Sequence, residues 1–206
     1  MYQLPQLPYD FSSLEPFIDM HTVGLHYNKH EQNYLNQLNK LLLENNYDYC
    51  YSLGELIYHV NEFNSSDRED ILYNLGGVLN HDLYWKSINS KRKTKPQGLL
   101  KQMIENKYGS FDRFFNEFKS NALKLKGSGY TFLILNENRE LDIINLSNQE
   151  TPLLYGHIPL FNIDMWEHSY YLNYKNEKGL YIDNFMAISD FGNANEIVKN
   201  LNIINF

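Results

Sequence analysis

The sequence predicts an α+β fold, in which a long N-terminal helical hairpin is followed by a C-terminal α/β domain with a three-stranded antiparallel sheet. Three observations support this prediction. The first half of the chain holds two long segments with apolar residues at helical spacing. Two strand-like runs, 130–135 and 141–146, come later and are separated by a short polar loop. The basic polar run 91–96 between the halves indicates a linker, so we expect domains at 1–90 and 91–206.

The chain begins with an extended lead-in over residues 1–18, because three of its prolines follow closely on one another and disfavour helix. A long helix is expected over 20–45. Its apolar face is marked by Leu35, Leu38 and Leu42, which recur three and four positions apart.

A polar, tyrosine-rich turn over 46–54 and a short helix over 55–62 connect this helix to the next one. The pattern S-x-x-E at Ser66 and Glu69 is a capping box, which predicts the start of the second long helix. We expect that helix to continue to about Ser87, and the two long helices then form a hairpin.

The second half alternates helices and strands. Ser110 is a good N-cap for one of its helices, and the glycine-rich break at 127–129 precedes the first strand. Strands are expected at 130–135, 141–146 and 157–164. Helices are expected at 97–107, 110–125, 166–174, 180–190 and 193–203.

Composition excludes several classes of protein. Hydrophobic residues make up 43% of the 206 residues and charged residues 21%, which rules out disorder of the whole chain. The single cysteine, Cys50, rules out an intramolecular disulfide and favours a reducing compartment. A net charge of −7 argues against general nucleic-acid binding. Because the sequence also lacks a long apolar run and the features of a signal peptide, we expect a cytoplasmic protein with no nucleic-acid or membrane partner.

Histidine spacing points to a metal site. His26 and His30 lie four positions apart on the first long helix, with Tyr34 four further on, so all three share one face. A third histidine, His81, lies late in the second long helix. Asp164 is expected at the end of the third strand, with His168 one helical turn later.

The candidate ligands are therefore three imidazoles and one carboxylate: His26, His81, His168 and Asp164. Such a set suits a first-row metal such as manganese, iron, cobalt or zinc and disfavours calcium or magnesium. Spacing alone leaves open that His26 and His30 are structural, or that His81 is a hydrogen-bonded core residue.

Longer segments resemble the iron/manganese superoxide dismutase family. The segment 26–34 reads HYNKHEQNY and looks like the family's opening helix, and 80–85 reads NHDLYW and resembles the segment of its second ligand. The segment 164–172 reads DMWEHSYYL, close to the family signature D-x-W-E-H-A-Y-Y-L. The matches occur in family order and extend from about residue 4 to 205.

The resemblance implies an oxidoreductase that disproportionates superoxide to dioxygen and hydrogen peroxide at a mononuclear manganese or iron site. By position, its metal ligands are those same three histidines and Asp164. The catalytic residues at the substrate entrance would be His30 and Tyr34, together with Gln149, a glutamine that hydrogen-bonds solvent at the metal. Because the substrate is an anion, we expect the cations Lys29 and Lys178 at this entrance.

The resemblance also bears on the metal. Iron-type members usually carry that glutamine on the second helix, at the position of Gly77, whereas manganese-type members carry it after the second strand, where Gln149 lies. Manganese is therefore favoured. Tyr84 and Thr151 are closer to iron-type sequences, so iron or dual manganese/iron use stays open. Tyr130 and Phe132 replace the two tryptophans that are usual in the family.

Family dimers further imply a homodimer. Its contacts would involve Glu167, His168, Tyr171 and His30. The glutamate would reach His168 of the partner subunit, and the tyrosine would reach His30 of the partner subunit. Two alternative functions are a hydrolase that uses a non-redox zinc and a non-catalytic metal-binding relative. The sequence lacks the H-E-x-x-H pattern of a zinc protease, which argues against the first alternative.

Overall fold

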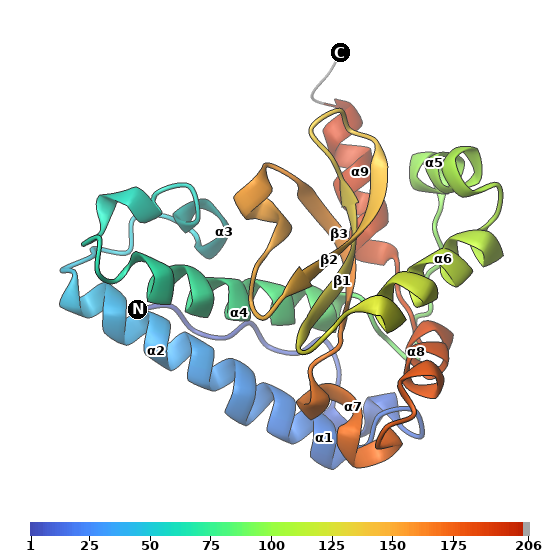
Figure 1. Ribbon diagram of the computed structural model, residues 1–206, viewed down its shortest axis with the longest axis horizontal. Coiled ribbons are helices and arrows are strands. Elements are labelled where there is room, and N and C mark those ends of the chain that lie inside the picture. The colour runs from blue at the N-terminus through green and yellow to red at the C-terminus, as the bar shows by residue number, and fades with distance from the viewer. Residues whose placement is uncertain (204–206) are drawn as a thin grey trace.

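The computed structural model describes residues 1–203, and it consists of a helical hairpin joined to a mixed part with one sheet (Figure 1). The hairpin is built by α2 and α4, which run side by side in opposite directions. Its helices are α1 (Met20–Leu25), a π-helical segment (His26–Glu31), α2 (Gln32–Glu44), α3 (Leu53–Leu56) and α4 (Arg68–Lys86). The remaining elements are α5 (Gly98–Tyr108), α6 (Phe111–Lys124), β1 (Gly129–Leu135), β2 (Leu141–Ser147), β3 (Ile158–Asp164), α7 (Glu167–Tyr174), α8 (Lys178–Ala187) and α9 (Gly192–Ile203). The α+β class and the three-stranded antiparallel sheet are confirmed.

The leucine stripe of the first long helix is the hairpin's core. Leu35, Leu38 and Leu42 are at most 1% exposed, and the last two pack in one cluster with Leu75 of α4. Burying an apolar side chain of this size stabilises the fold by about 2 kcal/mol. The helix that the sequence predicted over 20–45 is present but passes through the π-helical segment, whose wider turns sequence periodicity did not indicate.

The start of α4 differs from the prediction. The helix begins at Arg68 after Asp67, and no side chain caps it. The N-cap position is Asp67, one residue after Ser66, and the hydroxyl of Ser66 donates a hydrogen bond to the Asp67 carboxylate. The capping box of this region lies earlier, where Ser52 and Glu55 start α3.

The sheet has the strand order β2-β1-β3, with antiparallel pairing on both sides of β1. Every residue of β1 is buried, because each face of this strand is covered. Phe132 faces a cluster that includes Leu83 of α4, while Leu133 belongs to the main core with Phe118 of α6. The register sets Tyr130 opposite Asp164, so β1 carries an aromatic side chain beside the end of β3.

The other predicted helices and strands agree with the structure within about three residues, except the short helix expected over 55–62. There α3 covers only Leu53–Leu56, and a separate 3₁₀ turn follows at Val60–Glu62. Ser110 caps α6 as expected. Two 3₁₀ turns were not predicted, Phe11–Leu14 in the lead-in and Pro152–Tyr155 before β3. Among the described residues, no helix combines the length and the apolar character needed to cross a membrane.

Candidate metal centre

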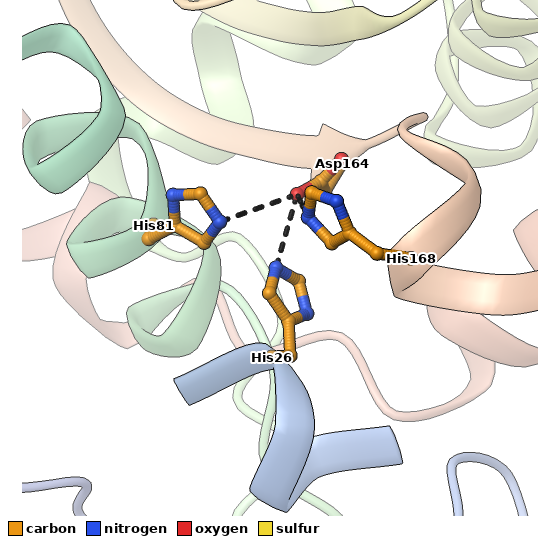
Figure 2. Close-up of side chains that lie close together, drawn as sticks. All are labelled: His26, His81, Asp164 and His168. Atoms are coloured by element: carbon orange, nitrogen blue, oxygen red, sulfur yellow. Dashed lines mark hydrogen bonds and ion pairs between the residues drawn. The ribbon is translucent and has the colours of Figure 1, made fainter. Parts of the chain in front are cut away.

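Four elements bring the candidate ligands together (Figure 2). His26 starts the π-helical segment, His81 lies on α4, Asp164 ends β3, and His168 lies in the first turn of α7. One ligand atom from each residue lies within 4.8 Å of the others. His26 and Asp164 lie 138 positions apart in the sequence, and in the fold their side chains are within hydrogen-bond distance.

The carboxylate of Asp164 is the centre of the cluster. Its Oδ2 atom lies 3.1 Å from Nε2 of His26, 3.4 Å from Nε2 of His168 and 3.8 Å from Nε2 of His81. Its other oxygen, Oδ1, accepts a hydrogen bond of 2.7 Å from the backbone N–H of Trp166. That bond fixes the carboxylate so that Oδ2 faces the three imidazoles.

Burial sets the protonation states of the cluster. Desolvation lowers the pKa of His26 to about 4, and it also lowers the pKa of His81 well below its ordinary value. Burial alone would raise the pKa of Asp164, but the neighbouring His168 and His26 hold it below its usual range. At neutral pH, His26 and His81 are therefore neutral and Asp164 is ionised, which are the forms that bind metal ions.

Two imidazole nitrogens are left without a hydrogen-bond partner. The Nδ1 atom of His81 lies 2.5 Å from the carbonyl oxygen of Gly77 and donates to it, which leaves Nε2 with its lone pair directed at the cluster. That Nε2 atom and Nε2 of His168 are buried, and among the described residues neither has a hydrogen-bond partner. Buried polar atoms are nearly always satisfied, so the cluster fits a cation that accepts both lone pairs.

Comparison with known proteins agrees with this chemistry. A family model described as iron/manganese superoxide dismutases, alpha-hairpin domain, matches residues 1–89. A second, described as iron/manganese superoxide dismutases, C-terminal domain, matches residues 96–197. The chain belongs to the iron/manganese superoxide dismutase family.

Curated relatives of this chain are named for both metals. "Superoxide dismutase [Fe] 2, chloroplastic" of Oryza sativa subsp. japonica is 39% identical over 186 residues, which cover 90% of this chain and 72% of the relative. "Superoxide dismutase [Mn]" of Buchnera aphidicola subsp. Acyrthosiphon pisum is 38% identical over 94% of this chain and 96% of its own length. "Superoxide dismutase [Mn]" of Listeria monocytogenes serovar 1/2a is 34% identical over 95% of this chain and 96% of its own length.

The three residues expected beside the ligands also lie at the cluster. The ring of His30 stacks on that of His168, with 4.1 Å between centroids and 13° between planes. Nε2 of Gln149 donates a hydrogen bond of 3.0 Å to the Tyr34 hydroxyl, whose ring lies 5.5 Å from that of His81. Burial raises the pKa of Tyr34, so its hydroxyl keeps its proton at neutral pH.

A cavity of about 800 Å³ opens over Tyr34 and His30. Lys29, expected from the sequence at the entrance, lines it together with Lys40 and Tyr73, which the sequence analysis did not single out. The sequence did hold a signal for Lys40. It lies eleven positions after Lys29, which is close to three helical turns, so the two lysines share one face of the helix. Lys178, also expected at the entrance, lies with its ammonium 5.8 Å from the ring of Tyr170.

The aromatic substitutions keep the wall of the site filled. Tyr130 and Phe132 are fully buried, with their ring centroids 5.8 Å apart. The hydroxyl of Tyr130 lies 3.3 Å from Nδ1 of His81, a polar contact beside the same nitrogen that binds the Gly77 carbonyl. Trp166 stacks on His168 at 5.6 Å, so a tryptophan still covers the α7 side of the cluster.

Proposed function

We propose that this chain disproportionates superoxide at one metal ion held by His26, His81, Asp164 and His168. The observation that carries the proposal is the cluster itself: four ligand atoms within 4.8 Å, two of them buried imidazole nitrogens without a hydrogen-bond partner. A bound manganese or iron ion would supply one-electron oxidation of one superoxide and one-electron reduction of a second. Two superoxide ions and two protons then give one dioxygen and one hydrogen peroxide.

The chain's own residues supply access and protons. Superoxide is an anion and the chain carries a net charge of −7, so attraction has to be local. The cations Lys29 and Lys40 line the cavity, and the screening length of about 8 Å at physiological salt makes such near charges count most. At the base of the cavity, we assign proton delivery to Tyr34, held by Gln149, with His30 beside it.

Manganese is the metal we propose, with iron or dual use as the alternative. Gly77 has no side chain to offer the site from α4, and Gln149 occupies that side of the cluster instead, with its amide on Tyr34. Its Oε1 atom is buried and has no hydrogen-bond partner among the described residues, so it is free to bind solvent at the metal. This supports the manganese-type arrangement, although the relatives include enzymes of both kinds.

We further propose a homodimer formed around Glu167, His168, Tyr171 and His30. Tyr171 is 47% exposed, and Leu172 beside it is equally exposed, which leaves an apolar edge next to the site. His30 is likewise exposed although its ring stacks on His168. A two-fold interface here would use each contact twice. We also propose that the chain divides into two domains, 1–90 and 91–206, and that the protein is cytoplasmic.

Elemental analysis and a superoxide assay on the same samples test the function. Protein produced with manganese or with iron should hold about one ion per chain, and activity should follow manganese content. His81→Ala should lose metal and activity together, because it removes one of four ligands. His21→Ala, an exposed histidine of α1, is the matched control and should change neither. A protein that retains only zinc and consumes no superoxide would favour the hydrolase alternative, and a fully loaded, active His81→Ala variant would remove His81 from the site.

A further inference from the structure

A buried carboxyl group lies at the end of the π-helical segment. The side chain of Glu31 is 1% exposed, although it belongs to an ionisable residue. Its Oε2 atom accepts a hydrogen bond of 2.7 Å from Nε1 of Trp85 on α4. Its Oε1 atom is buried without a hydrogen-bond partner in the described part of the chain. Burying such a group is costly, so its position calls for a function.

The partner of Glu31 is a residue that touches the metal centre. The ring of Trp85 packs against that of His26, with 4.8 Å between centroids and 61° between planes. The indole is itself only 3% exposed, and Nε1 is its one polar atom. The direction of the indole is therefore set by where Nε1 finds an acceptor, and the acceptor is Glu31.

We propose that Glu31 is a positioning residue of the metal centre, which holds the indole of Trp85 against His26 and thereby fixes the ring of that ligand. The inference rests on the proposed role of His26 as a ligand. Residues that contact a metal ligand commonly set its orientation and the metal affinity. Here that residue is Trp85, and Glu31 in turn holds Trp85 in place. Without the anchor, the indole N–H is buried and unsatisfied, and rotating the ring to satisfy it would open the space behind His26.

The carboxyl group acts in this role mainly as a hydrogen-bond acceptor. Burial raises the pKa of Glu31 to about 8, while the bond from Trp85 acts in the opposite direction. At neutral pH the group is therefore mostly protonated, and glutamine reproduces both its shape and its acceptor oxygen. Methionine has a similar length and volume but offers no comparable acceptor, which makes Glu31→Gln and Glu31→Met a matched pair.

The test measures manganese affinity by chelator competition. It compares wild type, Glu31→Gln and Glu31→Met, first with Trp85 present and then with each combined with Trp85→Phe. We expect Glu31→Gln to bind manganese within about twofold of wild type and Glu31→Met to bind it about tenfold more weakly. In the Trp85→Phe background the same Met substitution should cost less than about twofold, because the donor that needed Glu31 is gone. Equal losses in both backgrounds, or equal losses for Gln and Met, would overturn the proposal.

A second readout separates this inference from the proposed function. The chain has two tryptophans, so in a Trp166→Phe background the fluorescence of the metal-free protein reports on Trp85 alone. Glu31→Met should shift the emission maximum and Glu31→Gln should leave it in place, whatever the protein's activity. An unchanged spectrum in Glu31→Met would refute the anchor. A protein with the expected spectral pair but no superoxide chemistry would refute only the proposed function.

Discussion

At the scale of single residues, Asp164 organises the site more than any histidine does. One of its oxygens is fixed by a backbone N–H, and the other faces three imidazole nitrogens at 3.1–3.8 Å. The spacing of Asp164 and His168 was visible in the sequence because both lie in one short segment. The contact of Gln149 with Tyr34 joins residues 115 positions apart. The family resemblance placed both residues at the site but did not indicate that they touch.

Gln149→Ala should keep the metal but lose most of the turnover, by roughly tenfold or more. The four proposed ligands are untouched, whereas Tyr34 loses the amide that donates to its hydroxyl. Metal content per chain and the superoxide consumption rate, measured on one preparation, check this. An unchanged rate at full metal loading would mean that Gln149 has no part in the reaction.

Glu31 should make the stability of the protein depend on pH. Its pKa is about 8 in the folded protein, above the usual value of 4.5, so the folded state holds this proton more tightly than the unfolded chain does. Between pH 4.5 and 8 the unfolded chain ionises first, and the free energy of unfolding falls as the pH rises. Below that window the titration of Glu31 does not change the stability, and above it the full cost of about 5 kcal/mol applies.

Glu31→Gln removes this titration. Urea unfolding of both proteins at pH 5 and pH 8.5 should show the variant gaining stability over wild type as the pH rises. Because each comparison is made at one pH, other titrating groups largely cancel. A difference that stays constant between the two pH values would show that Glu31 does not carry a raised pKa.

At the scale of secondary-structure elements, periodic patterns predicted most of the fold. The leucines of α2 and the apolar run of β1 occupy the core because burial follows the helical and strand repeats. End signals were less reliable: S-x-x-E occurs at Ser52 and again at Ser66, and only the first caps a helix. The helix at Ser66 instead starts one residue later, with Asp67 at the N-cap position, a shift that the pattern does not encode.

The contact between α4 and α2 depends on a glycine. A Cβ atom at Gly77 would lie 2.5 Å from Cγ of the Tyr34 ring, so the tyrosine packs directly on the backbone of α4. Gly77→Ala should push this ring out of place, lower stability by about 1–3 kcal/mol and reduce activity. Gly54→Ala in α3 is the matched control, because a Cβ atom there meets no atom of residues 1–203 within 4 Å. Denaturant unfolding and the superoxide assay should show losses of stability and activity in Gly77→Ala but not in Gly54→Ala. If both variants kept the stability and activity of wild type, the Tyr34 ring would be able to move aside freely.

At the scale of the whole molecule, the proposed interface lies next to the metal centre. Glu167→Ala should weaken the dimer and metal retention together, over the same range of protein concentration. The physical reason is that the glutamate would orient the partner's last imidazole ligand. Sedimentation combined with metal analysis at several concentrations measures both quantities. Glu196→Ala, an exposed glutamate of α9, is the control and should leave both unchanged. A metal-replete, active monomer of Glu167→Ala would show that the interface lies elsewhere.

The wide separation of the four proposed ligands along the chain has a consequence for how a metal ion would be acquired. His26 and Asp164 are 138 positions apart, and His168 lies later still, so a growing chain cannot complete the site until most of it has been synthesised. Selection between manganese and iron then falls to the finished protein and to the ions available around it at that moment. An ion held by the four proposed ligands would tie the hairpin to the sheet as a cross-link over a long loop. Release of the ion would require that link to open, so we expect exchange to be slower than at a site built on a single element.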